Sequence, residues 1–333
     1  MTELFRTVID VPKPGKQLTY SDKIILMGSC FADNIGSRLK EYKFPVKHNP
    51  FGVLYNPLSV KKNLESLINQ KLFKETDLHF HNDLWFSFQH HSSFSHPDKL
   101  VCLEKINSSL TETSGFLRDA GFLFITFGTA WVYEHKADNS IVANCHKLPA
   151  NEFNRYLLSV DDIIQNYDQL ISRLKELNPD LKLVFTVSPI RHWKDGAVNN
   201  QVSKSTLILA IHKLTEKYPD VEYFPAYEIF MDELRDYRFY GNDMLHPSET
   251  AVEYTWKIFS DTYIDNASKL LMKEIRKINK AENHRPMNPA TTSYQEFLKS
   301  TIRKIESLQK NHPYLNLEKD LHYFTMQLKE YFV

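Results

Sequence analysis

The sequence lacks any apolar run long enough to cross a bilayer, for which a helix needs about 20 consecutive apolar residues. It also lacks a secretory signal at its start. Residues 1–17 mix charges, prolines and isolated apolar side chains, whereas a signal peptide has a continuous apolar segment after a basic beginning. We therefore expect a soluble, cytoplasmic protein with no membrane partner.

An excess of either charge is missing as well. The 41 Lys and Arg residues cancel the 41 Asp and Glu residues, so no overall electrostatic field attracts the chain to nucleic acid or to an anionic membrane. We expect no nucleic-acid partner. Internal repeats and low-complexity tracts are also absent from the sequence, which is typical of an ordinary globular chain.

Cysteine is scarce, with only Cys30, Cys102 and Cys145. Three scattered cysteines do not make a disulfide framework, and the odd number leaves at least one free thiol in a monomer. A chemical role for a thiol is therefore open. What the 333 residues do contain is 42% apolar and 13% aromatic side chains, which is ample for one large core and an appendage.

Apolar runs that alternate with helical patterns indicate the architecture. Runs rich in β-formers predict strands at 23–27, 122–127, 181–187 and 221–224. Apolar residues at helical spacing predict helices at 31–42, 159–177, 205–218 and through 252–259. This alternation predicts a three-layer α/β/α fold with a doubly wound, mostly parallel sheet, whose ligands bind beyond the carboxyl ends of the strands.

The texture of the sequence changes at about His284, where residues 285–289 read Arg-Pro-Met-Asn-Pro and break the chain. Two amphipathic patterns follow, at 293–309 and 315–332. We predict an α/β domain over residues 1–283 and a helical C-terminal appendage over 284–333. Residues 71–102 are rich in His, Ser and Phe without a clean period, which indicates an insertion with short strands.

The turn Gly28-Ser29-Cys30 lies between the first predicted strand and its helix. Such a turn lifts a side chain clear of the sheet, and the helix N-terminus adds unpaired N–H groups and a partial positive charge. That charge is expected to lower the pKa of the Cys30 thiol and to favour the nucleophilic thiolate. Ser29 is the neighbouring hydroxyl, and it would need an adjacent base.

A base is offered by the segment Gly241-Asn242-Asp243-Met244-Leu245-His246, which comes directly before the predicted helix through 252–259. An Asp and a His three residues apart at such a junction can let the carboxylate orient the imidazole. The other ring nitrogen is then free to take a proton from a nucleophile. Asp243 alone could equally be a helix cap, so this spacing by itself is a weak signal.

Together these turns are more specific. Their order resembles that of the SGNH/GDSL hydrolases, and Gly28-Ser29-Cys30-Phe31-Ala32 spells the motif that names the GSCFA family, which is similar to those hydrolases. Further segments resemble the same family, and they are Asn49-Pro50-Phe51-Gly52, Tyr55-Asn56-Pro57, Asn144-Cys145-His146-Lys147, Ser188-Pro189-Ile190-Arg191-His192 and Asp236-Tyr237-Arg238-Phe239-Tyr240. The resemblance covers about residues 20 to 265 and leaves out the C-terminal appendage.

The resemblance implies roles for single residues. It places Cys30 at the nucleophile position and Ser29 where a GDSL enzyme has an acid, and it keeps Asp243 and His246 unchanged. Gly52 matches a glycine whose N–H helps to bind the oxyanion. The family's Gly-x-Asn-Asp block departs here, because residues 128–131 read Gly-Thr-Ala-Trp and lack the asparagine side chain.

An oxyanion donor must therefore come from elsewhere. Asn144 and the backbone N–H groups of Cys30 and Gly52 are the candidates. The remaining residues expected to line or shape the substrate site are Gly128, Thr129, His146, Arg191 and His192. Arg191, His192 and Lys194 follow a strand end, where a cation can hold an anionic substrate group or cap loop carbonyls. Trp131, Tyr133 and Trp193 could form a wall that stacks on a sugar, although large aromatics are more often core.

The leading hypothesis is a hydrolase or acyltransferase acting on an ester, for example an acylated carbohydrate, through an acyl-enzyme on Cys30 or Ser29. One alternative is a non-catalytic module on the same fold that binds a glycan or an acylated ligand. Another is a metal-assisted hydrolase that uses the histidines of residues 79–96, although these have no metal-ligand spacing and we predict no metal or other cofactor. The oligomeric state is left open.

Overall fold

Five parallel strands form the main sheet, in the spatial order β10-β9-β5-β1-β2. In the computed structural model, which describes residues 7–332, these strands are β1 (Lys23–Gly28), β2 (Val46–His48), β5 (Ala120–Phe127), β9 (Lys182–Val187) and β10 (Val221–Tyr223). All but β2 coincide with predicted apolar runs, so the parallel sheet is confirmed. Residues 1–6 and Val333 lie outside the described residues. The first six belong to the segment that was expected not to be a secretory signal.

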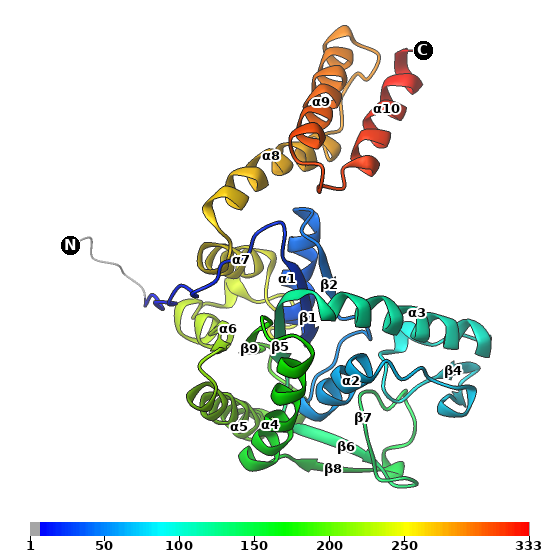
Figure 1. Cartoon of the computed structure of the whole chain (residues 1–333), viewed down its shortest axis with the longest axis vertical. Coiled ribbons are helices and arrows are strands. Elements are labelled where there is room, and N and C mark those ends of the chain that lie inside the picture. Colours follow the sequence, from blue (N-terminus) through cyan, green and yellow to red (C-terminus); the bar gives the residue numbers. More distant parts are fainter. Residues whose placement is uncertain (1–6, 333) are drawn as a thin grey trace.

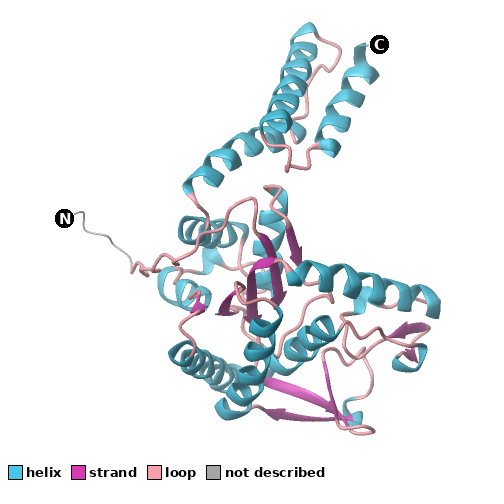
Figure 2. Cartoon of the chain, viewed as in Figure 1, coloured by secondary structure: helices cyan, strands magenta, loops and turns pink. Residues whose placement is uncertain are grey.

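Side chains alternate between the two faces of the sheet, and each face has its own core. Ile25 and Met27 of β1 pack with one set of helices, α2 (Pro57–Asn69), α3 (Lys99–Arg118), α4 (Val160–Leu177) and α5 (Gly196–Lys217). Ile24 and Leu26 pack on the other side with α1 (Cys30–Glu41) and α7 (Glu249–Tyr263). The sheet thus lies between helical layers, as predicted (Figure 2).

Two smaller sheets accompany the main one. A hairpin of β3 (His79–His81) and β4 (Leu84–Phe86) lies in the predicted insertion and confirms its short strands. A three-stranded antiparallel sheet in the order β7-β6-β8 was not predicted, and it consists of β6 (Trp131–His135), β7 (Ser140–Val142) and β8 (Phe153–Leu157). This second sheet follows the carboxyl end of β5, and it therefore supplies side chains to that edge of the fold.

Three helices extend from the α/β body at the C-terminal end of the chain (Figure 1). They are α8 (Asn266–Glu282), α9 (Thr292–Asn311) and α10 (Glu318–Phe332). The predicted helical appendage is confirmed as helices, whereas the limits of the two domains stay a prediction. Lys43 ties the loop after α1 to α10, because its Nζ lies 2.7 Å from Oδ2 of the buried Asp320. Between β10 and α7 the chain forms the short helix α6 (Ala226–Glu228) and a π-helical turn over Ile229–Glu233.

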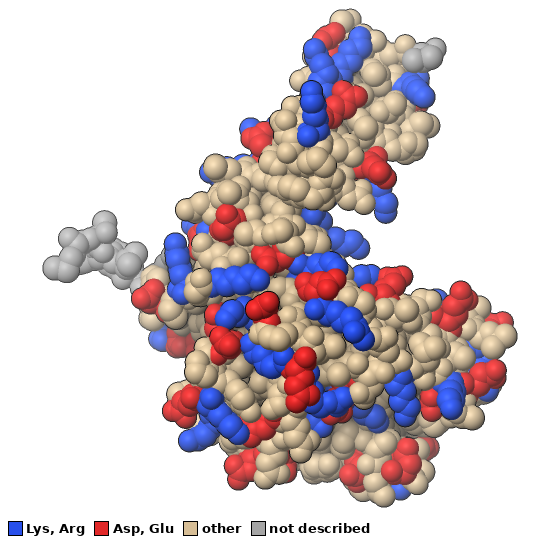
Figure 3. Space-filling model, viewed as in Figure 1, with Lys and Arg blue, Asp and Glu red and all other residues tan. Residues whose placement is uncertain are grey.

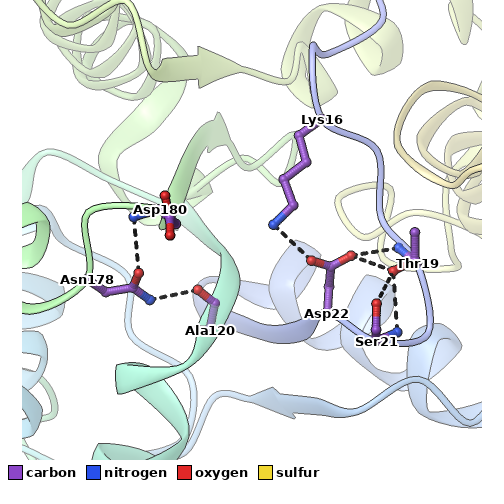
Figure 4. A network of polar contacts seen from close by, with 7 residues as sticks. All are labelled: Lys16, Thr19, Ser21, Asp22, Ala120, Asn178 and Asp180. Atoms are coloured by element: carbon purple, nitrogen blue, oxygen red, sulfur yellow. Dashed lines mark hydrogen bonds and ion pairs between the residues drawn. The ribbon is translucent and has the colours of Figure 1, made fainter.

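Polar side chains close the amino-terminal edge of the sheet (Figure 4). Asp22 accepts hydrogen bonds from the backbone N and Oγ1 of Thr19 and pairs with Lys16. Asn178 donates from Nδ2 to the carbonyl oxygen of Ala120, at 2.8 Å, before β5 enters the sheet. Elsewhere on the face drawn in Figure 3, basic and acidic side chains are interspersed. Within residues 7–332, no helix is both long enough and apolar enough to cross a membrane.

Gly28 ends β1 in a conformation that other residues rarely adopt. Its φ is +128°, and an added Cβ would lie 2.0 Å from the carbonyl oxygen of Thr126 on the neighbouring strand. Both observations require glycine, because the contact is with backbone that cannot turn aside. The chain can therefore make this turn out of the sheet only with glycine at position 28.

We expect Gly28→Ala to lower the free energy of unfolding by at least about 1 kcal/mol, since it adds strain and a backbone clash. Gly115→Ala is the matched control, because Gly115 lies in α3 with open space around it, and there alanine should stabilise by roughly 0.5–1 kcal/mol. Urea unfolding followed by circular dichroism measures both. Equal effects of the two substitutions would contradict the special role of Gly28.

Candidate active site

A cavity of about 510 Å³ is lined by the loops at the carboxyl ends of β1, β5 and β9, where ligands of parallel sheets usually bind. The small antiparallel sheet lines it as well, through Trp131 and Tyr133 of β6 and Arg155 of β8. The loop before α7 contributes His246. The cavity therefore draws residues from the whole length of the α/β part of the chain.

Most of the residues singled out from the sequence lie in this one cavity. Its lining includes Ser29, Cys30, Thr129, Asn144, Arg191, His192 and His246. Asp243 is bonded to His246, whereas Gly52, Gly128 and His146 are not part of the lining. The structure thus brings the Gly-Ser-Cys turn and the imidazole to the same space, although more than 200 residues separate them in the sequence.

Asp243 and His246 form a tight pair. Oδ2 of Asp243 lies 2.5 Å from Nδ1 of His246, and Oδ1 accepts the backbone N–H groups of His246 and Leu245 at 2.9 and 3.0 Å. These backbone bonds, together with the imidazole, hold the pKa of Asp243 at about 2, so the carboxylate is charged at neutral pH. The pair leaves Nε2 of His246 as the ring nitrogen available to a nucleophile.

Ser29 and Cys30 stand at the junction of β1 and α1. Ser29 is the N-cap residue with only 1% of its surface exposed, and its backbone N donates to the carbonyl oxygen of Thr126 at 3.0 Å. Cys30 is the first residue of the helix and is half-buried. Both line the cavity, and the thiol is the more accessible of the two nucleophiles.

The electrostatics of Cys30 differ from the expectation for a helix N-terminus. Burial raises the pKa of the thiol, and the nearby carboxylate of Asp33 raises it further. The backbone N–H of Cys30, the Ser29 side chain and the charge of Lys204 lower it, but they do not outweigh burial. The thiol is therefore protonated at neutral pH and needs a base before it can attack.

Asn49 fixes the turn from the side. Its Oδ1 accepts the N–H of Gly28 at 2.8 Å, and its Nδ2 donates to Oδ1 of Asp33 at 2.9 Å. One buried amide thus joins the end of β1 to the first turn of α1, and it comes from the segment Asn49-Pro50-Phe51-Gly52 that the sequence analysis noted as a block. The block therefore shapes the turn, and none of its four residues is part of the cavity lining.

The proposed oxyanion donors are not equivalent. The N–H of Gly52 donates to the carbonyl oxygen of Asn49 at 2.8 Å, and that of Gly128 donates to Tyr55 at 2.8 Å, so neither amide is free. Asn144 accepts the N–H of His146 through Oδ1 at 2.9 Å, while its Nδ2 donates to none of residues 7–332. Asn144 therefore remains a candidate donor, and Gly52 does not fit the role that the resemblance implied.

Two histidines near the cavity are held neutral by burial. The pKa of His192 is lowered to about 4 by burial and by the positive charge of Lys204. Burial also lowers the pKa of His146 to about 4. Its Nε2 lies 3.0 Å from the carbonyl oxygen of Ser87, so this ring anchors the loop. These imidazoles stay uncharged near pH 7, so they add no charge of their own to the cavity.

The histidines of residues 79–96 do not gather around a common point. His79 and His81 lie in the short strand β3. His90, in contrast, is fully buried and contacts the rings of Phe51 and Phe73. Over residues 7–332, no group of three or more His, Cys, Asp or Glu side chains is placed to hold a metal ion. The arrangement of the described residues therefore gives no support to the metal-assisted alternative.

Lys204 is a site residue that the sequence analysis missed. It lies on α5 with no exposed surface, and its Nζ donates to the carbonyl oxygens of Gly128 and Ser188, both at 2.6 Å. These carbonyls belong to the turns after β5 and β9, so the ammonium group holds two walls of the cavity together. Lys204 lies one turn before Leu207 on the buried stripe of the helix. Extending the predicted helix by one residue would have placed Lys204 on this stripe, but not in the site.

Burial lowers the pKa of Lys204 from 10.5 to about 7. The unfolded chain therefore binds more protons than the folded one between about pH 7 and pH 10.5, so the free energy of unfolding must rise with pH in this window. We expect the wild type to gain stability from pH 7 to pH 9 relative to Lys204→Met, by up to ~1.4 kcal/mol per pH unit. Chemical denaturation at several pH values measures this difference, and parallel curves for the two proteins would contradict it.

Two family models match successive parts of the chain. The model of the GSCFA family matches residues 23–259, and that of the C-terminal domain of GSCFA domain proteins matches residues 275–330. Among curated proteins, none matches.

Two solved structures are remotely similar. One is an acetyl xylan esterase from the rumen bacterium Butyrivibrio proteoclasticus, with a TM-score of 0.37, 12% identity and coverage of 73% of this chain. The alignment spans 64% of that esterase's length. The other is a family 3 carbohydrate esterase from Clostridium thermocellum, with a TM-score of 0.35 and 9% identity, covering 72% of this chain and 94% of that one.

Proposed function

The chain belongs to the GSCFA family, and we propose that it hydrolyses or transfers an acyl group from an ester, with Cys30 as nucleophile. His246 acts as the base and Asp243 orients it. The observation that carries this proposal is the pair of Asp243 and His246, 2.5 Å apart, on the rim of the cavity that Cys30 lines. The carboxylate fixes the imidazole, and the cavity provides the place where thiol and base meet a substrate.

The chemistry proceeds in two halves. Nε2 of His246 takes the proton of the Cys30 thiol, and the sulfur attacks the ester carbonyl carbon. The N–H groups at the start of α1 and Nδ2 of Asn144 stabilise the oxyanion that forms. When the C–O bond breaks, His246 returns the proton to the leaving alcohol. Water or an acceptor alcohol then attacks the acyl-thioester with the same base, and the thiol is restored.

Removal of the base is the first test of this mechanism. We expect His246→Ala to lower kcat/KM for p-nitrophenyl acetate by about 10²–10⁴-fold, the usual contribution of general acid-base catalysis. His212→Ala is the matched control, because His212 is exposed on α5 and pairs only with Glu216. If the two substitutions have equal effects, His246 is not the base.

The choice between the two nucleophiles is tested by the acyl-enzyme. We expect the acyl group to be found on the peptide that contains Cys30 after rapid acid quenching, and Cys30→Ala to abolish both the adduct and the activity. Ser29→Ala should keep the adduct, because Ser29 is almost fully buried and its role is at the helix start. Mass spectrometry of the quenched protein locates the adduct. An adduct that persists in Cys30→Ala would assign the reaction to Ser29.

A non-catalytic binding module is the second candidate, and two observations favour it. The pKa of the Cys30 thiol is raised, and the amides of Gly128 and Thr129 are both taken by the carbonyl oxygen of Tyr55. Under this alternative the wild type and the His246→Ala variant bind an acylated ligand equally and neither turns it over. The activity assays above therefore decide between the two functions.

A further inference from the structure

The cavity carries more positive than negative charge. Arg155, Arg191 and Lys194 line it, and among residues 7–332 the only acidic side chain in the lining is Asp195. The whole chain has equal numbers of acidic and basic residues, and the surface drawn in Figure 3 mixes both signs. The excess is therefore a property of this site and not of the protein.

The acidic side chain of Asp195 is already paired with Arg155. Arg155 forms this ion pair with Asp195, whose side chain is only 4% exposed. Its guanidinium also lies over the rings of Trp131 and Tyr133, 4.3 and 5.4 Å from their centroids. Arg155 is thus neutralised and held in place, and it covers ring faces that the sequence analysis had considered for stacking on a sugar.

Arg191 and Lys194 have no such partner. Neither forms an ion pair or a side-chain hydrogen bond with any residue in the range 7–332. The positive charge of Arg191 acts to lower the pKa of Lys204 and of Tyr240, and that of Lys194 acts to lower the pKa of Cys145. Asp243 is bonded to His246 and does not offset them. Two cations therefore line the cavity without a counter-charge from any of the described residues.

We propose that the alcohol part of the substrate carries a negatively charged group, a carboxylate or a phosphate, which Arg191 and Lys194 bind. This inference rests on the proposed ester chemistry for the identity of the bond that reacts. Arginine matches both anions through paired N–H donors, and the partly enclosed site strengthens the attraction relative to open solvent. Arg191 follows β9 beside His192, so the anion would lie within the same cavity as the ester bond.

The test compares three substrates that share one acyl group: the acetyl esters of glucose, of glucuronate and of a hexose phosphate. We expect the wild type to have a kcat/KM at least about tenfold higher for one or both anionic esters than for the neutral one. The difference should lie mainly in KM and should shrink as salt is added. Glucuronate and hexose phosphate separate the two sources of negative charge.

Substitution then assigns the preference. Arg191→Gln and Lys194→Gln should each lower the ratio of anionic to neutral kcat/KM, and the double variant should bring it close to one. Lys213→Gln is the matched control, since Lys213 is exposed on α5 and lies outside the cavity lining. A wild-type ratio near one, or an unchanged ratio in the double variant, would overturn the inference while leaving the proposed function intact.

Failure of the proposed function has a different signature, because none of the three esters would be turned over. Calorimetry with glucuronate and with inorganic phosphate then decides the binding site independently. Binding by the wild type that is lost in the double variant supports the cationic site. Absence of binding by the wild type overturns it.

Discussion

The backbone of Gly28 is the constraint on which the candidate site depends. Strand β1 is pressed against β5 so closely at this point that a side chain would overlap the carbonyl oxygen of Thr126. The chain must turn there with a positive φ, and α1 starts two residues later. Asn49 then fixes the turn by binding Gly28 and Asp33 at once. Cys30 consequently stands directly after the end of β1, a strand that is buried from Ile24 to Gly28.

Burial has opposite consequences for the charged groups around this turn. It raises the pKa of Cys30 and lowers that of Lys204, so it disfavours both the thiolate and the ammonium ion. Each of these groups favours the charged form of the other, because Lys204 lowers the pKa of Cys30 and Cys30 raises that of Lys204. The positive charge of Lys204 behind the cavity wall thus favours the thiolate form of Cys30. The same charge helps to keep His192 neutral.

Sequence patterns identified the parts of the fold whose local signal agrees with their environment. The continuous apolar runs of β5 and β9 are buried on both faces. Because such a run is apolar at every position, it predicts a strand whichever helices cover it. The antiparallel sheet was not predictable in this way. Strand β6 pairs with β8 across a separation of about twenty residues, and its polar members Glu134 and His135 face partners that only the tertiary fold supplies.

The site shows the same division between local and tertiary signals. Asp243 and His246 could be paired from their spacing, because their geometry is set within one loop. Lys204 could not be recognised as part of the site, since a lysine within a helical pattern is usually solvated and its role comes from two carbonyls on other elements. Gly52 was assigned a free N–H by resemblance, and the turn closed by Asn49 removes it. Motifs therefore indicated which segments meet, whereas the hydrogen bonds decided which atoms remain available.

Cys30 and His246 are held in place in contrasting ways. Cys30 rests on the buried sheet, but the side chains of His246 and Asp243 are 57% and 49% exposed. Their loop is held by its own bonds, such as the N–H of Gly241 to the carbonyl oxygen of His246 at 2.7 Å. The orientation of the imidazole is thus independent of the core, while its approach to the thiol depends on where this loop rests against the strand ends. Because His246 lies on the exposed side, a molecule that fills the cavity would shield the pair from water and strengthen their electrostatic interaction.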